Sequence, residues 1–181
     1  MTNSMKAKFV IRGLRASDKN DLIANELSMF DEAKKDINFG QILEKKRPTL
    51  PELRKWFAKC LRTSKSGESI DLVGVMDGKV VALCSVDKVG YGYETEHVGE
   101  LGITIVKEGR GIGIGKAIVR EILKKARKKY EIIEATGIFS TNKAAIRLYE
   151  GAGFKTCAVM PSHMKRGNKY FNEIRMSLRL K

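Results

Sequence analysis

Apolar and polar residues repeat along the chain with two different periods, and the changes of period predict the order of secondary structure. Spacings of three and four residues are typical of amphipathic helices, whereas alternation and short apolar runs are typical of strands. Helices are predicted over 17–29, 50–61, 114–129 and 141–153. Strands are predicted over 8–12, 69–76, 79–86, 96–106, 132–139, 154–160 and 170–180. The charged stretch 31–47 fits neither period and is left unassigned.

Local signals set several of these boundaries. Ser17 is a plausible N-cap, and Thr49 with Glu52 has the spacing of a capping box. Asp77-Gly78 joins two apolar runs as a tight hairpin turn. We expect a polar loop over 161–169, between the last two strands. The whole chain, 1–181, reads as one domain of α/β (α+β) class, with a mixed sheet covered by helices on both faces.

The charge balance favours anionic partners. The chain has 35 basic and 21 acidic residues, a formal net charge of +14. Much of this charge recurs every four residues, as Lys116, Arg120 and Lys124, opposite the apolar face of the third helix. That pattern describes a solvated helix face, and aromatic residues do not interleave it, so we do not expect nucleic-acid binding.

Other classes of protein are disfavoured by what the chain lacks. It has no run of 18 apolar residues and no apolar signal core, so we expect a cytoplasmic protein without a membrane partner. Its three cysteines, Cys60, Cys84 and Cys157, are widely separated among apolar neighbours. We therefore expect buried, inert thiols and no metal site.

The stretch "EGRGIGIGK", residues 108–116, contains four glycines between an arginine and a lysine. A P-loop would need a glycine where Arg110 stands and a hydroxyl residue where Ala117 stands. The G-x-G-x-x-G dinucleotide pattern fails from either possible starting glycine. The spacing that fits is Arg110-x-x-Gly113-x-Gly115.

This glycine run lies between a predicted strand and a predicted helix. The first N–H groups of a helix have no intrahelical partner, and the helix dipole adds positive potential there. Glycines allow a pyrophosphate to approach those N–H groups closely. The alternative is a glycine-rich turn that serves packing alone.

Two motifs together resemble the acetyl-CoA-dependent N-acetyltransferases of the GNAT superfamily. "ELGITIVKEGRGIGIGKAIV" is similar to the family's R/Q-x-x-G-x-G/A cofactor motif. "STNKAAIRLYEGAGF" is similar to its N-x-x-A-x-x-L-Y-x-x-x-G-F segment. The resemblance covers nearly the whole chain, although 31–65 and the last loop carry little of it. It implies a seven-stranded, mostly antiparallel sheet whose central parallel strand pair splays apart around acetyl-CoA, the co-substrate.

The resemblance also assigns cofactor-binding positions. The strand residues that would pair with the pantetheine arm are Ile103, Thr104 and Ile105. The residues that match the pyrophosphate loop are Arg110, Gly111, Ile112, Gly113, Ile114, Gly115 and Lys116. Asn142 matches a side chain in contact with the pantetheine region.

The same resemblance makes Tyr149 the general acid that protonates the departing thiolate, with a core aromatic as the alternative. For the base we favour Glu100, acting directly or through water; His97 or water alone are the alternatives. Some relatives carry a glutamate on a later strand, but Gly137 stands at that position here. His163 is expected to line the acceptor groove.

We therefore read the protein as an N-acetyltransferase that moves acetyl directly to a primary amine. The acceptor classes are an amino acid, a peptide N-terminus or a lysine, and the basic last loop, with Lys165, Arg166 and Lys169, suits an acidic acceptor or a protein. A homodimer is a further partner to consider. The competing functions are a non-catalytic acyl-CoA-binding regulatory module and a basic nucleic-acid-binding protein.

Overall fold

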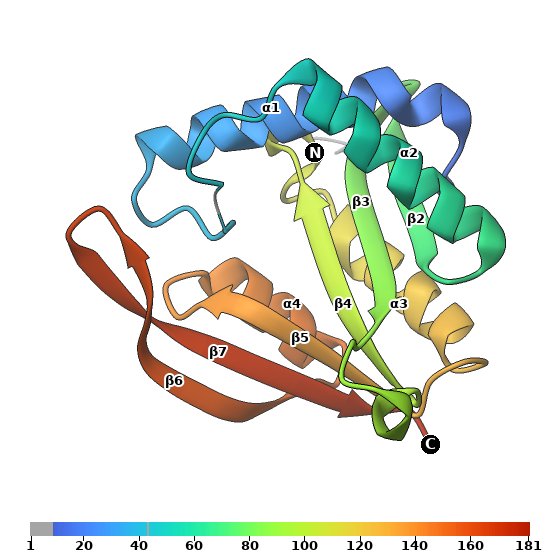
Figure 1. Cartoon of the computed structure of the whole chain (residues 1–181), viewed down its shortest axis with the longest axis vertical. Helices are drawn as coiled ribbons and strands as arrows, with labels where there is room; N and C mark the ends of the chain where they lie inside the picture. The colour runs from blue at the N-terminus through green and yellow to red at the C-terminus, as the bar shows by residue number, and fades with distance from the viewer. Residues whose placement is uncertain (1–8, 43) are drawn as a thin grey trace, which may run out of the picture.

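The computed structural model describes residues 9–42 and 44–181, which form a seven-stranded sheet in the order β1-β2-β3-β4-β5-β7-β6 (Figure 1). The strands are β1 (Phe9–Gly13), β2 (Ile70–Met76), β3 (Lys79–Lys88), β4 (Val98–Ile105), β5 (Ile132–Phe139), β6 (Lys155–Arg166) and β7 (Lys169–Arg179). β4 and β5 are parallel, and the other neighbouring strands are antiparallel. Lys8, predicted to begin the first strand, lies outside the described residues.

Helices cover both faces of the sheet, as the pattern predicts. They are α1 (Lys19–Lys35), α2 (Leu50–Ser66), α3 (Ile114–Ala126) and α4 (Lys143–Gly151). Short 3-10 turns span Ala16–Asp18, Tyr93–Thr95 and Lys107–Gly109. In Figure 1, α2 lies in front of β2 and β3, and α3 lies behind them. None of the helices in the described parts of the chain is long and apolar enough to cross a bilayer.

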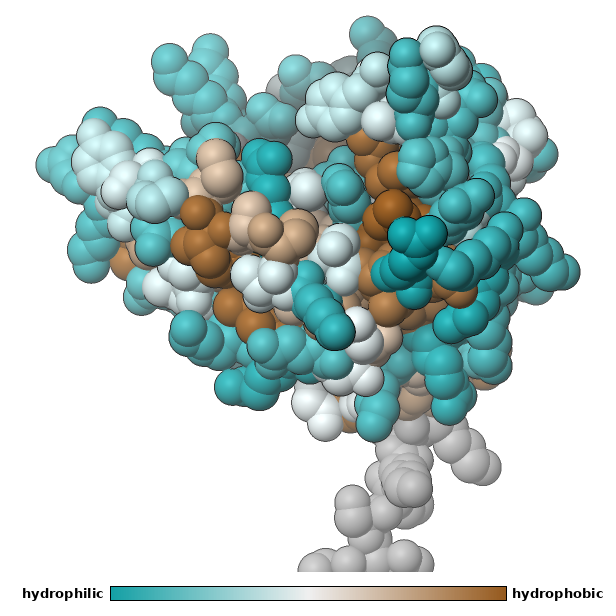
Figure 2. All heavy atoms as spheres, turned by 90° about the horizontal axis from the view of Figure 1, so that it is seen from below, coloured by the Kyte–Doolittle hydropathy of each residue, from teal (hydrophilic) through white to brown (hydrophobic). Residues whose placement is uncertain are grey.

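Strand alternation divides the apolar side chains between the two faces. Leu72 and Cys84 join the cluster built around α3, whose residues Ile118 and Ile122 are fully buried. Residues one position further along β2 and one position earlier on β3, Val73 and Leu83, pack instead with residues of α1 and α2. The charged side of α3 faces solvent, and the surface in Figure 2 is largely hydrophilic with separate apolar patches.

The capping box at α2 is confirmed, but the predicted cap at Ser17 is wrong. Thr49 and Glu52 bond reciprocally, as expected. Ser17 lies instead inside a 3-10 turn, and Asp18 is the residue that precedes α1. The Asp18 carboxylate is buried and bonds Arg12 at 2.7 Å and the Arg15 backbone N–H at 2.8 Å. An ion pair between the end of β1 and the residue before α1 thus sets this helix start.

The predicted loop over 161–169 is also wrong, because β6 and β7 continue through most of it. The ladder between them is interrupted between Met160 and Met164, where Ser162 has φ of 53°. Pairing then resumes, and Gly167, with φ of 58°, helps to turn the chain. A bulge therefore absorbs the residues that break the alternation.

The splayed parallel pair is confirmed. Between the described residues of β4 and β5 the register runs from Val98↔Ile132 to Glu100↔Glu134 and then ends. Figure 1 shows the two strands diverging beyond this point. On its other edge, β4 stays paired with β3 up to Ile105. The splay therefore leaves one edge of β4 without a neighbouring strand.

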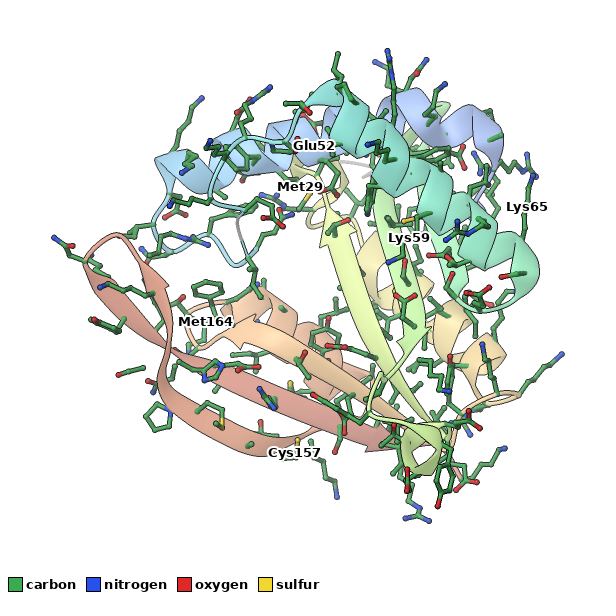
Figure 3. All side chains as sticks on the ribbon, viewed as in Figure 1. Met29, Glu52, Lys59, Lys65, Cys157 and Met164 are labelled. Carbon is green, nitrogen blue, oxygen red and sulfur yellow. The ribbon has the colours of Figure 1, made fainter. Side chains whose placement is uncertain are left out.

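The prediction of three buried thiols holds for one cysteine only. Cys84 is fully buried, Cys60 is half-buried, and Cys157 is exposed on the edge strand β6 (Figure 3). Burial raises the pKa of the Cys60 thiol to about 11. Cys157 was misplaced because β6 lies at the sheet edge, where apolar residues need no cover.

Candidate active site

A cavity of about 380 Å³ lies where β4 and β5 separate. β4, β5 and α4 supply most of its walls, with Leu101, Gly102, Ile103, Thr104, Thr136, Gly137, Ile138, Asn142, Ala145 and Tyr149, and residues of α1, α2, β3 and 40–42 complete it. The unpaired edge of β4 faces this space, so its N–H and C=O groups can pair with an extended ligand as another strand would. Two of the three predicted strand residues, Ile103 and Thr104, lie on that wall; Ile105 lines the adjoining cavity.

Asn142 caps α4 at the edge of the cavity. Its Oδ1 accepts a hydrogen bond of 3.1 Å from the Ala145 N–H, so part of its role is structural. Gly40 packs directly against it, since an added methyl group there would come within 1.9 Å of Asn142 Nδ2. A glycine at position 40 thus lets a distant segment lie over the start of α4.

Tyr149 is held on the inner face of α4. Its side chain is 5% exposed, and its ring packs on Phe154 with centroids 5.3 Å apart. Burial raises the pKa of the phenol well above its ordinary value, and the charges of Cys84 and Glu100 act in the same direction. The hydroxyl is therefore a proton donor throughout the neutral range.

The glycines of the run 109–115 serve two distinct purposes. Gly111 and Gly113 have φ of 77° and 89°, in the left-handed region, and a methyl group on either would meet open space. Gly115 lies close to β4, because a methyl group there would lie 2.9 Å from Ile105 Cδ1 and that side chain would have to shift. Gly113 is the N-cap of α3 and offers no side-chain cap. The first N–H groups of α3 are therefore available to an anion.

The two basic residues around the glycines differ in what they can do. The Arg110 guanidinium bonds both carboxylate oxygens of Glu32, one of them at 2.8 Å, and also the Ile105 carbonyl at 2.9 Å. The hydrogen bond from Arg110 lowers the pKa of Glu32. Arg110 thus fixes α1 against the loop with three of its five side-chain N–H groups. Lys116 is exposed and lines a groove between α3 and α4.

Glu100 and His97, the two side chains considered for the base, occupy different places along β4. Glu100 is the last paired residue before the splay, and its carboxylate accepts a hydrogen bond from Thr136 Oγ1, a group that belongs to the cavity wall. His97 precedes β4 and is exposed. It lies six residues before Ile103, or about 20 Å along a strand.

Part of the unassigned stretch lies over the splay. Residues 36–42 (the strap) follow α1 and line a cavity together with β4 and the start of α4. Arg166, from the end of β6, holds the strap by donating to the carbonyls of Ile37 at 3.1 Å, Phe39 at 2.7 Å and Gln41 at 2.6 Å. Its guanidinium lies over the Phe139 ring, 4.8 Å from the centroid. Arg166, read from the sequence as a surface charge, is a structural anchor.

Removing this anchor should loosen the strap. We expect Arg166→Ala to weaken acetyl-CoA binding roughly three- to ten-fold, because each hydrogen bond from a charged donor contributes about 1.5–3 kcal/mol, part of which water replaces. Hydrogen exchange of the strap amides should accelerate in parallel. Lys169→Ala, an exposed change on the same hairpin, is the control. Unchanged exchange in Arg166→Ala would show that the strap is held by other contacts.

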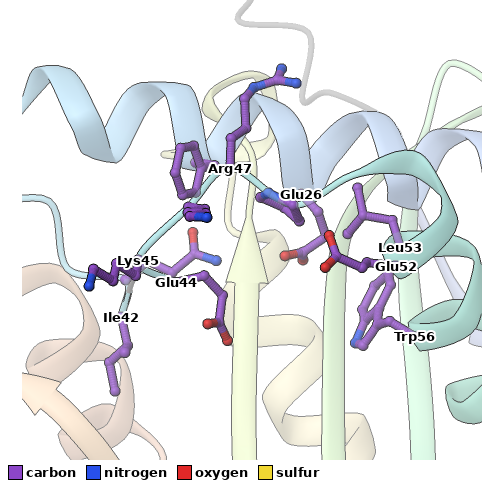
Figure 4. Close-up of a pocket in the computed structure, with 12 residues that line it drawn as sticks. Glu26, Ile42, Glu44, Lys45, Arg47, Glu52, Leu53 and Trp56 are labelled. Atoms are coloured by element: carbon purple, nitrogen blue, oxygen red, sulfur yellow. The ribbon is translucent and has the colours of Figure 1, made fainter.

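Two further cavities adjoin the splay, on the side away from the glycine loop. One, of about 690 Å³, lies between α1, α2 and residues 41–48 and includes Glu26, Gln41 and Trp56 (Figure 4). The other, of about 620 Å³, lies beside the β6–β7 hairpin and includes His163. The sequence analysis missed Glu26 and Gln41 entirely. The sequence feature that could have identified Glu26 is the presence of a carboxylate on the apolar face of a predicted helix.

Comparison with known proteins agrees with this geometry. Residues 31–154 match the acetyltransferase (GNAT) family. N-acetylaspartate synthetase from Xenopus tropicalis is 33% identical over 96 residues, which are 52% of this chain and 34% of that protein. The chain thus matches only about a third of the length of this curated relative.

Solved structures show the same fold over almost the whole chain. An N-acetyltransferase from Staphylococcus aureus Mu50 superposes with a TM-score of 0.81 at 20% identity, covering 96% of this chain and 99% of that one. YncA from Salmonella typhimurium, solved with its cofactor acetyl-CoA, also gives 0.81 at 20% identity, covering 96% and 94%. At this identity the likeness establishes the fold.

Proposed function

Because the chain belongs to the GNAT acetyltransferase family, we propose that it transfers the acetyl group of acetyl-CoA directly to a primary amine. Three features carry the proposal: the unpaired edge of β4, the uncapped start of α3 and the phenol of Tyr149. The first and the third line the splay cavity, and α3 begins after the loop that follows β4. The edge of β4 can pair with the amide groups of the pantetheine arm, and the start of α3 can bind the pyrophosphate. The phenol of Tyr149 can protonate the leaving thiolate.

The residues around the splay suit the proton movements of acetyl transfer. A nitrogen–carbon bond forms and a carbon–sulfur bond breaks, and the ammonium loses two protons, one to the thiol and one to solvent. We assign Glu100 to the removal of the proton from the amine, through Thr136 or water. Backbone N–H groups of β4 stabilise the negative charge that develops on the carbonyl oxygen. Tyr149 donates its proton or a hydrogen bond to the leaving sulfur.

The positions of the thiols also support direct transfer. A covalent acetyl-cysteine step would need a thiolate in the cavity, but the cavity wall described above includes no cysteine. Cys84, on the neighbouring strand, is fully buried in the α3 core, and burial raises its thiol pKa. The amine is therefore the nucleophile.

We further propose that the acceptor carries a carboxylate near its amine. The cavity beside the β6–β7 hairpin is lined by more basic than acidic side chains, among them Lys34, Lys45, Lys165 and Arg175. The curated relative is, by its name, a synthetase of N-acetylaspartate, the product of acetylating an acidic amino acid. Both features favour an acidic amino acid or an acidic peptide.

Acceptor screening tests the function. Purified protein is incubated with acetyl-CoA and pools of amino acids, peptides and polyamines, with thiol release and product mass as readouts. We expect turnover with carboxylate-bearing amines. Acetyl-CoA binding without turnover on any pool would favour a non-catalytic acyl-CoA-binding module instead.

Charge reversal tests the acceptor preference. The double variant Lys45→Glu, Lys165→Glu should raise KM for acidic acceptors by about ten-fold. Each exposed ion pair with the acceptor contributes about 0.2–1 kcal/mol, and the variant reverses the charge of two lysines. Acetyl-CoA affinity should not change, and added salt should erode the effect. Lys65→Glu, on the exposed end of α2, is the matched control. Equal KM values for acidic and basic acceptors in the wild type would contradict the preference.

A further inference from the structure

Glu26 is a carboxylate on the apolar, buried face of α1. Its neighbours three and four positions away share its face of α1. All four are buried: Leu22, Ile23, Met29 and Phe30. Within the described residues, Glu26 has no hydrogen bond or ion pair, and its side chain points instead into the space between α1 and α2 (Figure 4).

Gln41 presents a buried acceptor without a partner at the same place. Its side-chain Oε1 is buried and finds no hydrogen-bond partner among the described residues. The backbone of Gln41 is fixed, because its carbonyl accepts from Arg166 Nη2 at 2.6 Å. An unpaired buried acceptor costs about 1–3 kcal/mol, so such an atom indicates a missing donor.

Both residues line the splay cavity as well as the cavity between α1 and α2. Tyr149 and the β4 edge form other walls of the splay cavity. A group held between Glu26 and Gln41 would therefore lie in the space that leads to the reacting centre. We infer that Glu26 and Gln41 form the binding site for the ammonium group of the acceptor, an inference that rests on the proposed function.

The chemistry of an ammonium fits what these residues lack. A primary ammonium has three N–H donors and a positive charge, whereas the site has a carboxylate and a carbonyl oxygen that need donors. Burial raises the pKa of Glu26, and a cation beside it would favour the charged form of the carboxylate. The Trp56 indole, on the wall of both cavities, adds an aromatic ring that attracts cations.

The site also separates the two charges of an amino acid. Ile42 lines the ammonium site on one side and the basic cavity beside the β6–β7 hairpin on the other. An acceptor with its ammonium at Glu26 can therefore extend a carboxylate past Ile42 toward Lys45 or Lys165. This arrangement selects a zwitterionic acceptor over a polyamine, whose second cation would meet the basic cavity.

A binding measurement tests this without turnover. Trp56 is the only tryptophan in the chain, so its fluorescence reports on the site. The CoA-bound protein is titrated with n-butylammonium chloride, with potassium chloride at equal ionic strength as the reference. We expect saturable quenching in the wild type and about ten-fold weaker binding in Glu26→Gln. Glu44→Gln removes one charge from an exposed residue of the same cavity and should bind like the wild type.

The outcomes separate this site from the proposed function. Acetyl transfer with no Trp56 response to butylammonium, or equal losses in Glu26→Gln and Glu44→Gln, would overturn the site and leave the function standing. Tetramethylammonium has no N–H donors, so binding as tight as butylammonium would assign the affinity to Trp56 alone. In turnover, Glu26→Gln should raise the acceptor KM about ten-fold and leave acetyl-CoA affinity unchanged.

Discussion

Replacing Tyr149 with phenylalanine should lower kcat by about 10²- to 10⁴-fold if proton donation limits the rate. The dissociation constant of acetyl-CoA should barely change. Phenylalanine keeps the ring that packs on Phe154 and removes only the hydroxyl at the cavity. Thermal unfolding of the variant should therefore stay close to that of the wild type, which separates a catalytic loss from a folding defect.

The pH profile adds a second test of Tyr149. Its phenol pKa is raised, chiefly by burial, so the hydroxyl stays protonated above pH 10, where a free tyrosine would ionise. The wild type should accordingly show no fall in kcat from loss of this proton up to about pH 10. A Tyr149→Phe enzyme with full kcat would make Tyr149 a core aromatic.

The elements around the splay could be predicted because their signals are local. The glycine run, the Asn142-to-Phe154 segment and the hairpin at Asp77-Gly78 each depend on residues that are close in sequence. Asp77 and Gly78 have φ of 49° and 78°, as a tight hairpin turn of this kind requires. The strand pairs and the splay then follow from the order of these elements, together with the family resemblance.

The rest of the site depends on contacts between distant parts of the chain. The strap has no periodic pattern because it is ordered by Arg166, more than 120 residues away, and by the fit of Gly40 against Asn142. Arg110 is similarly occupied by Glu32. From sequence alone, each of these arginines reads as a charge available to a ligand. Only the folded chain shows which guanidinium groups already have partners.

Glu26 is another residue whose surroundings could not be predicted from the sequence. A carboxylate within an amphipathic helix is ordinarily solvated, so Glu26 was not identified although apolar residues three and four positions away mark its face of the helix. In the structure, α1 begins after Asp18 and extends to Lys35, which places Glu26 over the cavity. The acceptor side was therefore the least predictable part of the protein, since its walls come from α1, α2, the strap and the β6–β7 hairpin.

Replacing Gly113 with valine should weaken acetyl-CoA binding at least ten-fold, which corresponds to about 1.4 kcal/mol or more. Two effects combine at this position. A β-branched residue is strained at φ of 89°, and its side chain would occupy the open space in front of the first N–H groups of α3. Isothermal titration calorimetry with acetyl-CoA measures the loss directly.

Gly67 supplies a control for the strain in this experiment. It is also a helix-cap glycine in the left-handed region, with φ of 78° and open space where a side chain would lie, but it ends α2. Gly67→Val should therefore lower the melting temperature about as much as Gly113→Val, while acetyl-CoA binds with wild-type affinity. If both variants lose affinity equally, strain spreading through the fold explains the loss. If Gly113→Val binds as tightly as the wild type, the start of α3 is not the pyrophosphate site, and the glycines at 111 and 113 serve the turn alone.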